Sequence, residues 1–595
     1  MAKSGTMRNV IVALVCCWCG SAFGVDIKLT PDSSLTDAVR HARELRRTGK
    51  ATEVTIHLAP GTYRLYEPLR LRPEDSGLTI VGDDAIISGG QEVNGWTTEG
   101  TLLTADIPDF NGRPVDFRQL WVSSPLQTSP SRGDFQKAVR ARDVEDFEQM
   151  HRILTYDKKN RILWVPKAAV AKIMNAPYAE MVLHEMWCVS NLRIKSLTPQ
   201  GDSVAVRFHD PEAKLQFDHP WPSPMTPNTG HPSPFYLTNA KELLDKPGEW
   251  YYDFRAGKLY YMPLSNTAAS PAAVYPAIET LVEVIGTADY PVRDITFRGV
   301  TFSHTTWMRP TDKGHVPLQA GMYLTEAYKL RPQIDRKNNH KLDNQGWLGR
   351  ADAAVEVRYG ENVNFDGCRF EHLGGSGLDY VVGCKGGSIN GCQFSDIAMN
   401  GLVVGSFSPE GLETHLPYRP ADERKVCSGL TIEQSEFSHV SNEDWGCVAI
   451  AAGYVSGVTI AHNTIHDVSY SGISLGWGWN RDSVCMKNNK VHANLIYNYA
   501  QHMYDCAGIY TLGNQPGTVI SENVVRDIAK PSYVHDPNHW FYLYTDEGSS
   551  NITVRDNWTP SDKYLQNACG PGNIWQNNGP QVSDSIKQKA GKTKL

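Results

Sequence analysis

Two acidic positions in the last third of the chain have surroundings that suit acid–base chemistry. Asp505 stands directly before the apolar run 506–509, and tyrosines flank this segment. Asp546 and Glu547 follow the most aromatic run of the chain, 540–544. Two carboxyl groups can hydrolyse a glycosidic bond: one donates a proton to the leaving oxygen, and the other acts as nucleophile or activates water. An aromatic wall would raise the pKa of one of them by desolvation.

A structural role is the alternative for these aspartates, because Asp and Asn side chains also cap turns. Other polar and aromatic side chains could hold sugar hydroxyls or stack on sugar rings. The two tryptophans of segment 476–480 look like exposed loop rings, although core packing is equally open for them. The residues we expect to bind substrate are Glu443, Asp444, Trp477, Trp479, His502, His539, Trp540, Tyr544 and Glu547.

A short sequence motif, called the phrase below, recurs through the second half of the chain and predicts the scaffold. An Asn or small residue is followed by a polar or apolar residue and a hydrophobic one, at intervals of about 24 to 43 residues. A β-rich segment precedes the phrase, and glycines mark corners. Repeats of this size without a helical period are typical of a stacked solenoid, so we expect an all-β fold, a right-handed parallel β-helix. The phrase occurs at 368–370, 392–394, 435–437, 463–465, 494–496, 523–525 and, more weakly, 557–558.

The β-helix explains how residues far apart in sequence could meet. Neighbouring coils lie about 4.8 Å apart. Asp505 and Asp546 are expected on adjacent coils, because an insertion at 529–540 accounts for the extra length between them. A separation of about 5 Å between the carboxyls would indicate a retaining mechanism and about 6.5–9.5 Å an inverting one. Sequence spacing leaves that choice open.

The remaining segments divide the chain into five parts. A helix expected at 34–47 would cover the open end of the first coil. Between 97 and 290 the phrase disappears, and alternating strands with a Pro-rich loop at 220–234 indicate an antiparallel, β-sandwich-like insertion. The predicted parts are a signal peptide at 1–24, the cap and first coils at 25–96, the insertion at 97–290, the main β-helix at 291–580 and a loose tail at 581–595.

The N-terminus has the features of a secretory signal. Lys3 and Arg8 precede the apolar run 10–19, and 22–24 fits a small-x-small cleavage site. We therefore expect export to the periplasm or the extracellular space, with no transmembrane segment. A lipoprotein anchored at Cys16 is the weaker alternative, because no small residue precedes that cysteine.

Composition excludes several classes of function. A net charge of −7 over 595 residues provides no basic footprint for nucleic acid. Of twelve cysteines, three lie in the signal segment, and the nine that remain form no CxxC pair. An odd number excludes a fully paired disulfide framework, and neither a metal site nor a cofactor is expected. Cys368 and Cys392 occupy equivalent positions and are expected to stack as small apolar residues.

The order of these motifs is similar to that of a known enzyme family. The run 116–120, the strand 295–302, the segment 504–508 and the run 545–548 resemble glycoside hydrolase family 141, over nearly the whole mature chain. The resemblance implies a secreted hydrolase with α-L-fucosidase activity on pectin side chains or xylanase activity. It implies that the two catalytic aspartates are Asp505 and Asp546. An exo-acting α-L-fucosidase on pectin (rhamnogalacturonan) oligosaccharides, without essential metal, is our first expectation.

Two other classes of function remain as alternatives. A polysaccharide lyase can share this fold, but it normally needs a Lys or Arg base, often with bound Ca²⁺. Arg526 and Arg555 lie in the right region, although we expect them to make solvated or coil-end contacts. A non-catalytic, glycan-binding adhesin is the third class. An unsaturated, ultraviolet-absorbing product would indicate a lyase, and binding without turnover would indicate an adhesin. The oligomeric state stays open.

Overall fold

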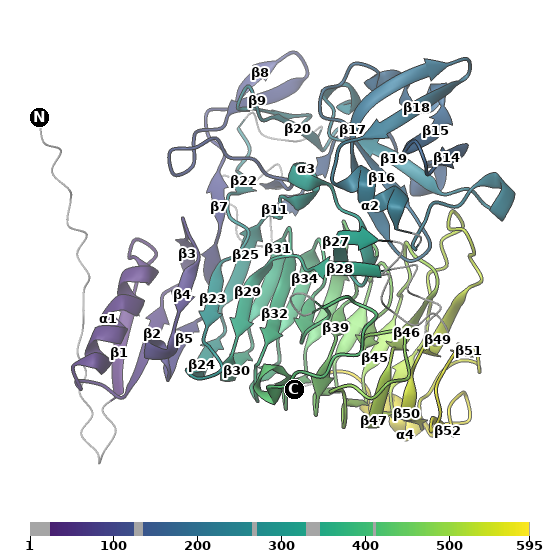
Figure 1. The fold of residues 1–595 in the computed structure, drawn as a ribbon. Coiled ribbons are helices and arrows are strands. Elements are labelled where there is room, and N and C mark those ends of the chain that lie inside the picture. The colour runs from purple at the N-terminus through teal and green to yellow at the C-terminus, as the bar shows by residue number, and fades with distance from the viewer. Residues whose placement is uncertain are drawn as a thin grey trace, which may run out of the picture.

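The fold of the protein is an elongated parallel β-helix with a second body packed against one side of it (Figure 1). The structure is a computed structural model. It describes residues 24–123, 135–219, 221–264, 270–328, 345–408 and 412–593. The predicted signal peptide therefore lies outside the described residues, apart from Gly24.

Three parallel sheets form the walls of the β-helix, and each complete coil contributes one strand to each sheet in the order A, B, C. Sheet A consists of β1 (Gly24–Leu29), β2 (Glu53–Leu58), β5 (Leu78–Gly82), β24 (Val292–Arg298), β30 (Gly360–Asp366), β33 (Ser388–Asn390), β37 (Thr431–Glu433), β41 (Thr459–Ala461), β44 (Lys490–His492), β47 (Asn514–Ser521), β50 (Ser550–Arg555) and β52 (Ile574–Gln576). Sheet B consists of β3 (Gly61–Arg64), β6 (Ala85–Ser88), β25 (Thr301–Thr305), β31 (Arg369–Leu373), β34 (Gln393–Ile397), β38 (Glu436–Val440), β42 (Thr464–His466), β45 (Leu495–Tyr497) and β48 (Val524–Val525). Sheet C consists of β4 (Leu69–Leu71), β23 (Val282–Ile285), β29 (Ala353–Arg358), β32 (Ser376–Val382), β35 (Leu402–Val404), β39 (Ile450–Ala452), β43 (Ile473–Leu475), β46 (Cys506–Thr511), β49 (Trp540–Thr545) and β51 (Tyr564–Gln566). The predicted right-handed parallel β-helix is confirmed.

The recurring phrase forms the interior of the β-helix. Its hydrophobic residues Phe370, Phe394 and Phe437 lie in register on neighbouring strands of sheet B. Their rings stack with centroids 4.6 and 4.4 Å apart and are almost completely buried. Each ring thus covers the next, and offset stacking adds to the hydrophobic gain.

The first residue of the phrase forms an asparagine ladder. In the later coils Asn463, Asn494, Asn523 and Asn557 each donate an Nδ2–H bond to the Oδ1 of the next Asn along, at 2.9–3.0 Å. Asn578 ends the ladder and extends the repeat by one coil beyond the sequence prediction. The side chains also bond backbone groups at the turn between sheets A and B, as Asn523 does to the Val491 carbonyl at 3.0 Å. The ladder satisfies buried polar groups that the turn would otherwise leave unpaired.

Asn523→Ala is expected to destabilise the β-helix by about 2–4 kcal/mol, because it leaves several buried donors and acceptors unsatisfied at about 1–3 kcal/mol each. Thermal unfolding followed by circular dichroism measures this as a lower Tm. Asn94→Ala is the matched control, since Asn94 is exposed and bonds only a nearby carbonyl. Equal Tm values for the two variants would show that the ladder does not contribute.

The cysteines follow the prediction. All nine in the described residues are free. Cys368 and Cys392 are fully buried at successive coils, and each thiol donates to a backbone carbonyl of the preceding coil. They fill the same interior row that Ser435 and the asparagines continue, so they act as small buried residues.

A helix closes the N-terminal end, as predicted. Helix α1 (Leu35–Arg47) begins at Ser34, whose side chain accepts from the Asp37 N–H, and buries its apolar face on the first coil. Strand β1, which was not predicted, pairs with β2 beneath it. Figure 1 shows both elements at the end of the solenoid, where they cover the edge of the first coil.

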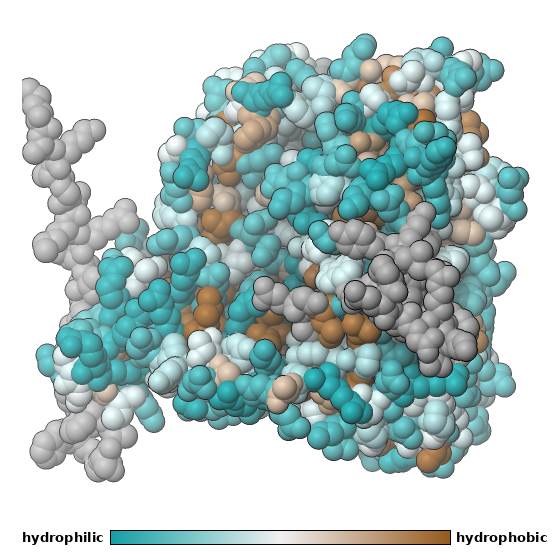
Figure 2. Space-filling model, viewed as in Figure 1, coloured by the Kyte–Doolittle hydropathy of each residue, from teal (hydrophilic) through white to brown (hydrophobic). Residues whose placement is uncertain are grey.

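The insertion contains three mainly antiparallel sheets. The first is β7 (Gly90–Glu92), β22 (Ala273–Pro276), β10 (Trp121–Ser123) and β11 (Phe135–Lys137), and the second is β8 (Thr97–Glu99), β9 (Leu102–Asp106), β21 (Lys258–Tyr261), β20 (Glu249–Asp253) and β12 (Val139–Arg140). The third is β13 (His151–Arg152), β19 (Pro234–Thr238), β16 (Glu180–His184), β17 (Val189–Gln200), β18 (Ser203–Phe208), β15 (Ile162–Pro166) and β14 (Thr155–Asp157), with helix α2 (Glu212–Asp218) against it. Two separate hydrophobic cores support them. Figure 2 shows further hydrophobic residues where the insertion meets the β-helix.

The structure differs from the prediction at two junctions. The parallel ladder resumes at β23 (Val282–Ile285), which pairs with β4 of the first coils, before the strand at 295–302. The tail was predicted to be loose, which is wrong for its described part. Helix α4 (Asp584–Lys589) forms, the Gly591 N–H bonds the Ala493 carbonyl at 2.8 Å, and Thr593 bonds Gln434. Polar contacts to the edge of the coils therefore fix the tail.

Two smaller features complete the fold. Between β25 and β29 the chain leaves the coil to form helix α3 (Arg309–Lys313) and the antiparallel strands β26 (Pro317–Gln319), β27 (Met322–Tyr328) and β28 (Gln345–Gly349). Strands β36 (Cys427–Ser428) and β40 (Val455–Ser456) form an additional short pair. No helix in the described residues is long and apolar enough to cross a membrane.

Candidate active site

Asp505 and Asp546 lie at the two ends of adjacent strands in sheet C. Asp505 directly precedes β46, and Asp546 directly follows β49. The two strands pair in parallel, with Tyr510 opposite Tyr544. The prediction that the two aspartates occupy adjacent coils is therefore confirmed.

Neutral hydrogen-bond donors hold Asp546. The Tyr510 hydroxyl donates to Oδ2 at 2.5 Å, and the Asn567 side-chain N–H donates to Oδ1 at 2.8 Å. The residue is only 9% exposed. Donors to both oxygens stabilise the ionised form of a carboxyl group.

A histidine accompanies Asp505. The backbone of Asp505 is in the left-handed region at φ 55°, which Asp tolerates better than most residues. The Asp505 N–H donates to the His539 carbonyl at 2.7 Å. His539 Nε2 lies 3.0 Å from Oδ1 of Asp505. The hydrogen bond to this carboxylate raises the pKa of His539 above its ordinary value. The Tyr470 hydroxyl donates to the Asp505 carbonyl at 2.8 Å.

Both carboxylates act on the same phenols. Burial raises the pKa of Tyr544, and the charges of Asp505 and Asp546 raise it further. The same causes, burial first, raise the pKa of Tyr470. Tyr510 and Tyr544 lie with ring centroids 5.0 Å apart. The charges of both aspartates therefore reach the same buried phenols, Tyr470 and Tyr544.

Only part of the predicted binding set meets at the two aspartates. His539 and Tyr544 belong to this part. Glu547 is half-buried next to Asp546. Trp540 is buried, and the ammonium groups of Lys530 and Lys563 lie 4.5 and 3.9 Å from its ring centroid.

His502 has a different position from the one expected. Its ring stacks on Trp445 at 4.4 Å, and Nδ1 pairs with the Tyr533 hydroxyl at 2.7 Å. Burial lowers its pKa to about 3, so it is neutral. His184 of the insertion contacts its backbone carbonyl at 2.8 Å. His502 therefore joins the insertion to the β-helix instead of contacting the aspartates.

The interpretation of Trp477 and Trp479 as exposed rings is wrong for Trp477. Its side chain is 1% exposed, and its indole N–H donates to Thr414 Oγ1 at 3.0 Å. Trp479 is half-buried, 5.0 Å from the Trp477 ring. Residues 412–418 leave the coil and cover this glycine-rich loop. Sequence spacing could not predict that contact.

The two arginines considered for a lyase lie apart from the aspartates. Arg526 pairs with Asp527 and stands over the Tyr497 ring, and Arg555 pairs with Asp556. These are the coil-end contacts that the sequence suggested. Among the described residues, no group of three or more His, Cys, Asp or Glu side chains could hold a metal ion.

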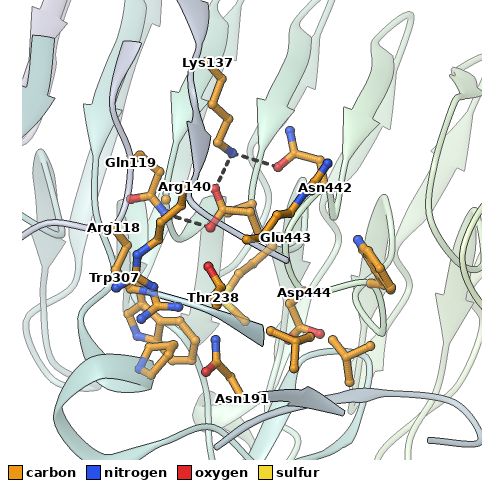
Figure 3. A pocket seen from close by; sticks show the side chains of 18 of the residues that line it. Arg118, Gln119, Lys137, Arg140, Asn191, Thr238, Trp307, Asn442, Glu443 and Asp444 are labelled. Carbon is orange, nitrogen blue, oxygen red and sulfur yellow. Dashed lines mark hydrogen bonds and ion pairs between the residues drawn. The ribbon is translucent and has the colours of Figure 1, made fainter. Parts of the chain in front are cut away.

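Glu443 and Asp444 line a separate cavity of about 350 Å³ between the insertion and the turns that lead into sheet C. Neither Asp505 nor Asp546 lines it. Figure 3 shows Lys137 and Gln119 of the insertion pointing at Glu443, to which they bond at 2.5 and 2.9 Å.

Asp444 also has a partner, because His315 Nε2 lies 2.8 Å from the Asp444 Oδ2. Both side chains are buried. Glu443 and Asp444 are thus each tied to a basic partner.

A buried ion network forms another wall of this cavity. Both oxygens of Glu180 accept from Arg118 at 3.0 Å and from Arg140 at 3.1–3.3 Å. Although burial alone would raise the pKa of Glu180, the two guanidinium groups lower it to about 2. Arg118 also donates to Thr311 of helix α3, so the network links the insertion to the β-helix.

Sequence reasoning missed several residues of both sites. The sequence could have indicated Tyr510, because it stands opposite Tyr544 at the equivalent position of the preceding coil. No sequence pattern indicates Tyr470, Asn567, Lys137 or Arg140, because turn lengths and the docking of the insertion bring these residues close.

Comparisons with known proteins agree with one another. Residues 100–264 match the family model of the GH141 insertion domain. A solved structure named as a glycoside hydrolase is 55% identical, with a TM-score of 0.91, and the match covers 96% of this chain and 99% of that one. None of the curated proteins matches.

Other solved structures are far less similar. The surface adhesin PfbA of Streptococcus pneumoniae is 10% identical over 92% of this chain and 89% of its own, with a TM-score of 0.33. A GH136 lacto-N-biosidase from Eubacterium ramulus is 10% identical over 52% of this chain and 51% of its own, with a TM-score of 0.29. Neither likeness carries a functional argument.

Proposed function

The chain belongs to glycoside hydrolase family 141, and from this premise we propose that it is an exo-acting α-L-fucosidase that trims pectin side chains. Asp505 and Asp546 are its proposed catalytic pair. The observation that carries the assignment is their shared electrostatic environment: the two aspartates border adjacent strands, and the charges of both raise the pKa of Tyr544. The predicted signal peptide supports export as part of the same proposal.

The contacts of the two aspartates support different roles. Asp546 accepts from two neutral donors, which favours an ionised carboxylate that acts as nucleophile or as base toward water. Asp505 lies 3.0 Å from His539, which can supply a proton beside it, and we give Asp505 the role of general acid. Tyr544 has a raised pKa, so its phenol stays protonated and can donate a hydrogen bond in the transition state.

Product analysis tests this proposal. The purified protein is incubated with pectin-derived oligosaccharides and, separately, with xylan, and the released sugars are separated by chromatography. Free fucose from the pectin material is the expected product. Xylo-oligosaccharides instead would overturn the fucosidase assignment while keeping a glycosidase. An ultraviolet-absorbing product, or binding without turnover, would contradict hydrolysis itself.

A further inference from the structure

The cavity between the insertion and the β-helix has the make-up of a second carbohydrate site. Its volume of about 350 Å³ lies within the range of small-molecule pockets. Phe147, Tyr236 and Trp445 form one apolar wall, with ring centroids 4.6–6.0 Å apart. Polar side chains from both bodies, among them Asn191 and Thr238, complete the lining. Aromatic faces together with a few polar groups are what a pyranose ring requires.

The polar lining is divided by charge. On one wall the guanidinium groups of Arg118, Arg140 and Arg142 outnumber the carboxylates beside them, Glu180 and Asp116. Burial raises the pKa of Asp116, while Arg140 and Arg118 act in the opposite direction.

Another part of the lining, around Glu443, is acidic on balance. The carboxylates of Glu443 and Asp396 share one ammonium group, Lys137, whose Nζ lies 2.5 and 3.6 Å from them. His372 is the other basic group on Asp396, 2.7 Å away. This acidic part suits sugar hydroxyls, which donate to carboxylates.

Arg142 is the charge best placed to take a ligand. Its guanidinium group lies over the Phe147 ring, 4.5 Å from the centroid, and it forms no ion pair with a described residue. By contrast, Arg118 and Arg140 both form ion pairs with Glu180. A guanidinium group with free donors at the edge of an apolar wall recognises a carboxylate in the bidentate manner.

The cavity is near Asp505 but separate from it. Glu443 and Trp445 lie in the turn before β39, and Asp505 lies in the turn before β46, two strands further along sheet C. At about 4.8 Å per coil this is about 10 Å along the axis. Trp445 lines the cavity and stacks on His502, so these rings stand between the two sites.

We propose that this cavity binds a uronic acid residue of an acidic polysaccharide, with the carboxylate on Arg142 and the hydroxyls toward Glu443. The site holds an acidic part of the substrate close to the aspartates without taking part in hydrolysis. The proposal goes beyond the proposed function, because it concerns binding in a different cavity and requires no turnover.

Binding of defined disaccharides tests the proposal. Isothermal titration calorimetry compares digalacturonate with the neutral disaccharide galactobiose at one ionic strength, on the full-length mature protein. Saturable binding of digalacturonate, with galactobiose weaker by about tenfold or more, is expected from the loss of charge-assisted bonds. Arg142→Gln is expected to weaken digalacturonate binding by a similar factor. Arg255→Gln is the matched control, because Arg255 also stands over an insertion ring, Tyr178, outside the cavity.

Each outcome of the titrations either supports or overturns uronic acid binding in this cavity. Equal binding of the two sugars, or equal dissociation constants for the Arg142 and Arg255 variants, would overturn the proposal. Thermal unfolding confirms that both variants fold. Hydrolysis of 4-nitrophenyl α-L-fucoside is measured in parallel and is expected to be unchanged by Arg142→Gln. If the wild-type protein does not cleave this fucoside, the fucosidase assignment fails while the binding result still stands.

Discussion

Asp546→Asn is expected to lower kcat by about a thousandfold or more on every substrate, because the amide can neither attack the anomeric carbon nor activate water. Asp505→Asn is expected to lower kcat comparably on pectin oligosaccharides, since the leaving sugar oxygen then receives no proton. The expected effect of Asp505→Asn is much smaller on an aryl fucoside, whose phenolate leaves without protonation. The measurement is kcat for each variant on both substrates.

The contrast between the two substrates tests the separate roles. Asp562→Asn is the control, because Asp562 is exposed on the following coil. Tm and near-ultraviolet circular dichroism show whether the Asn variants fold, a needed check because Asp546 also accepts from Tyr510 and Asn567. Full activity in either folded variant would refute the site assignment. The reverse pattern, with Asp546→Asn active only on the aryl fucoside, would exchange the two roles.

Glu180→Gln is expected to cost about 3–5 kcal/mol of stability at neutral pH, because two buried guanidinium groups lose the carboxylate between them. Glu180 is 1% exposed, and Arg118 is 8% exposed. Urea unfolding of the wild type and the variant measures the difference. Glu145→Gln is the control, since Glu145 is exposed on the same insertion. A variant as stable as this control would show that the network is not stabilising.

The effect of Glu180→Gln should depend on pH in a defined direction. The folded-state pKa of Glu180 is lowered from 4.5 to about 2. Its contribution is therefore fully present above its unfolded pKa and is lost as the pH falls from about 4.5 toward 2. The gap between wild type and variant should be widest at neutral pH and should shrink over that interval. A gap that is constant down to pH 2 would contradict the shifted pKa.

Much of the fold could be predicted because a solenoid repeats a local pattern. Phe370, Phe394 and Phe437 occupy the same position in each coil, so one stacking rule places all three. The asparagine ladder repeats in the same way from Asn463 onward. The early return of β23 to the first coils and the docking of the tail were not predictable, since both depend on contacts with residues far along the chain.

The sequence by itself determined the β-helix and the position of Asp505 and Asp546 on adjacent coils, because the repeat fixes the order of the strands that they border. Only the tertiary structure decided which side chains surround them. Tyr470 and Asn567 arrive from other coils through turns of irregular length. Only the folded insertion brings Gln119 to Glu443, 324 residues away, and creates the cavity. Repeating local contacts can be read from spacing, whereas the docking of one body on another depends on surfaces that exist only after both have folded.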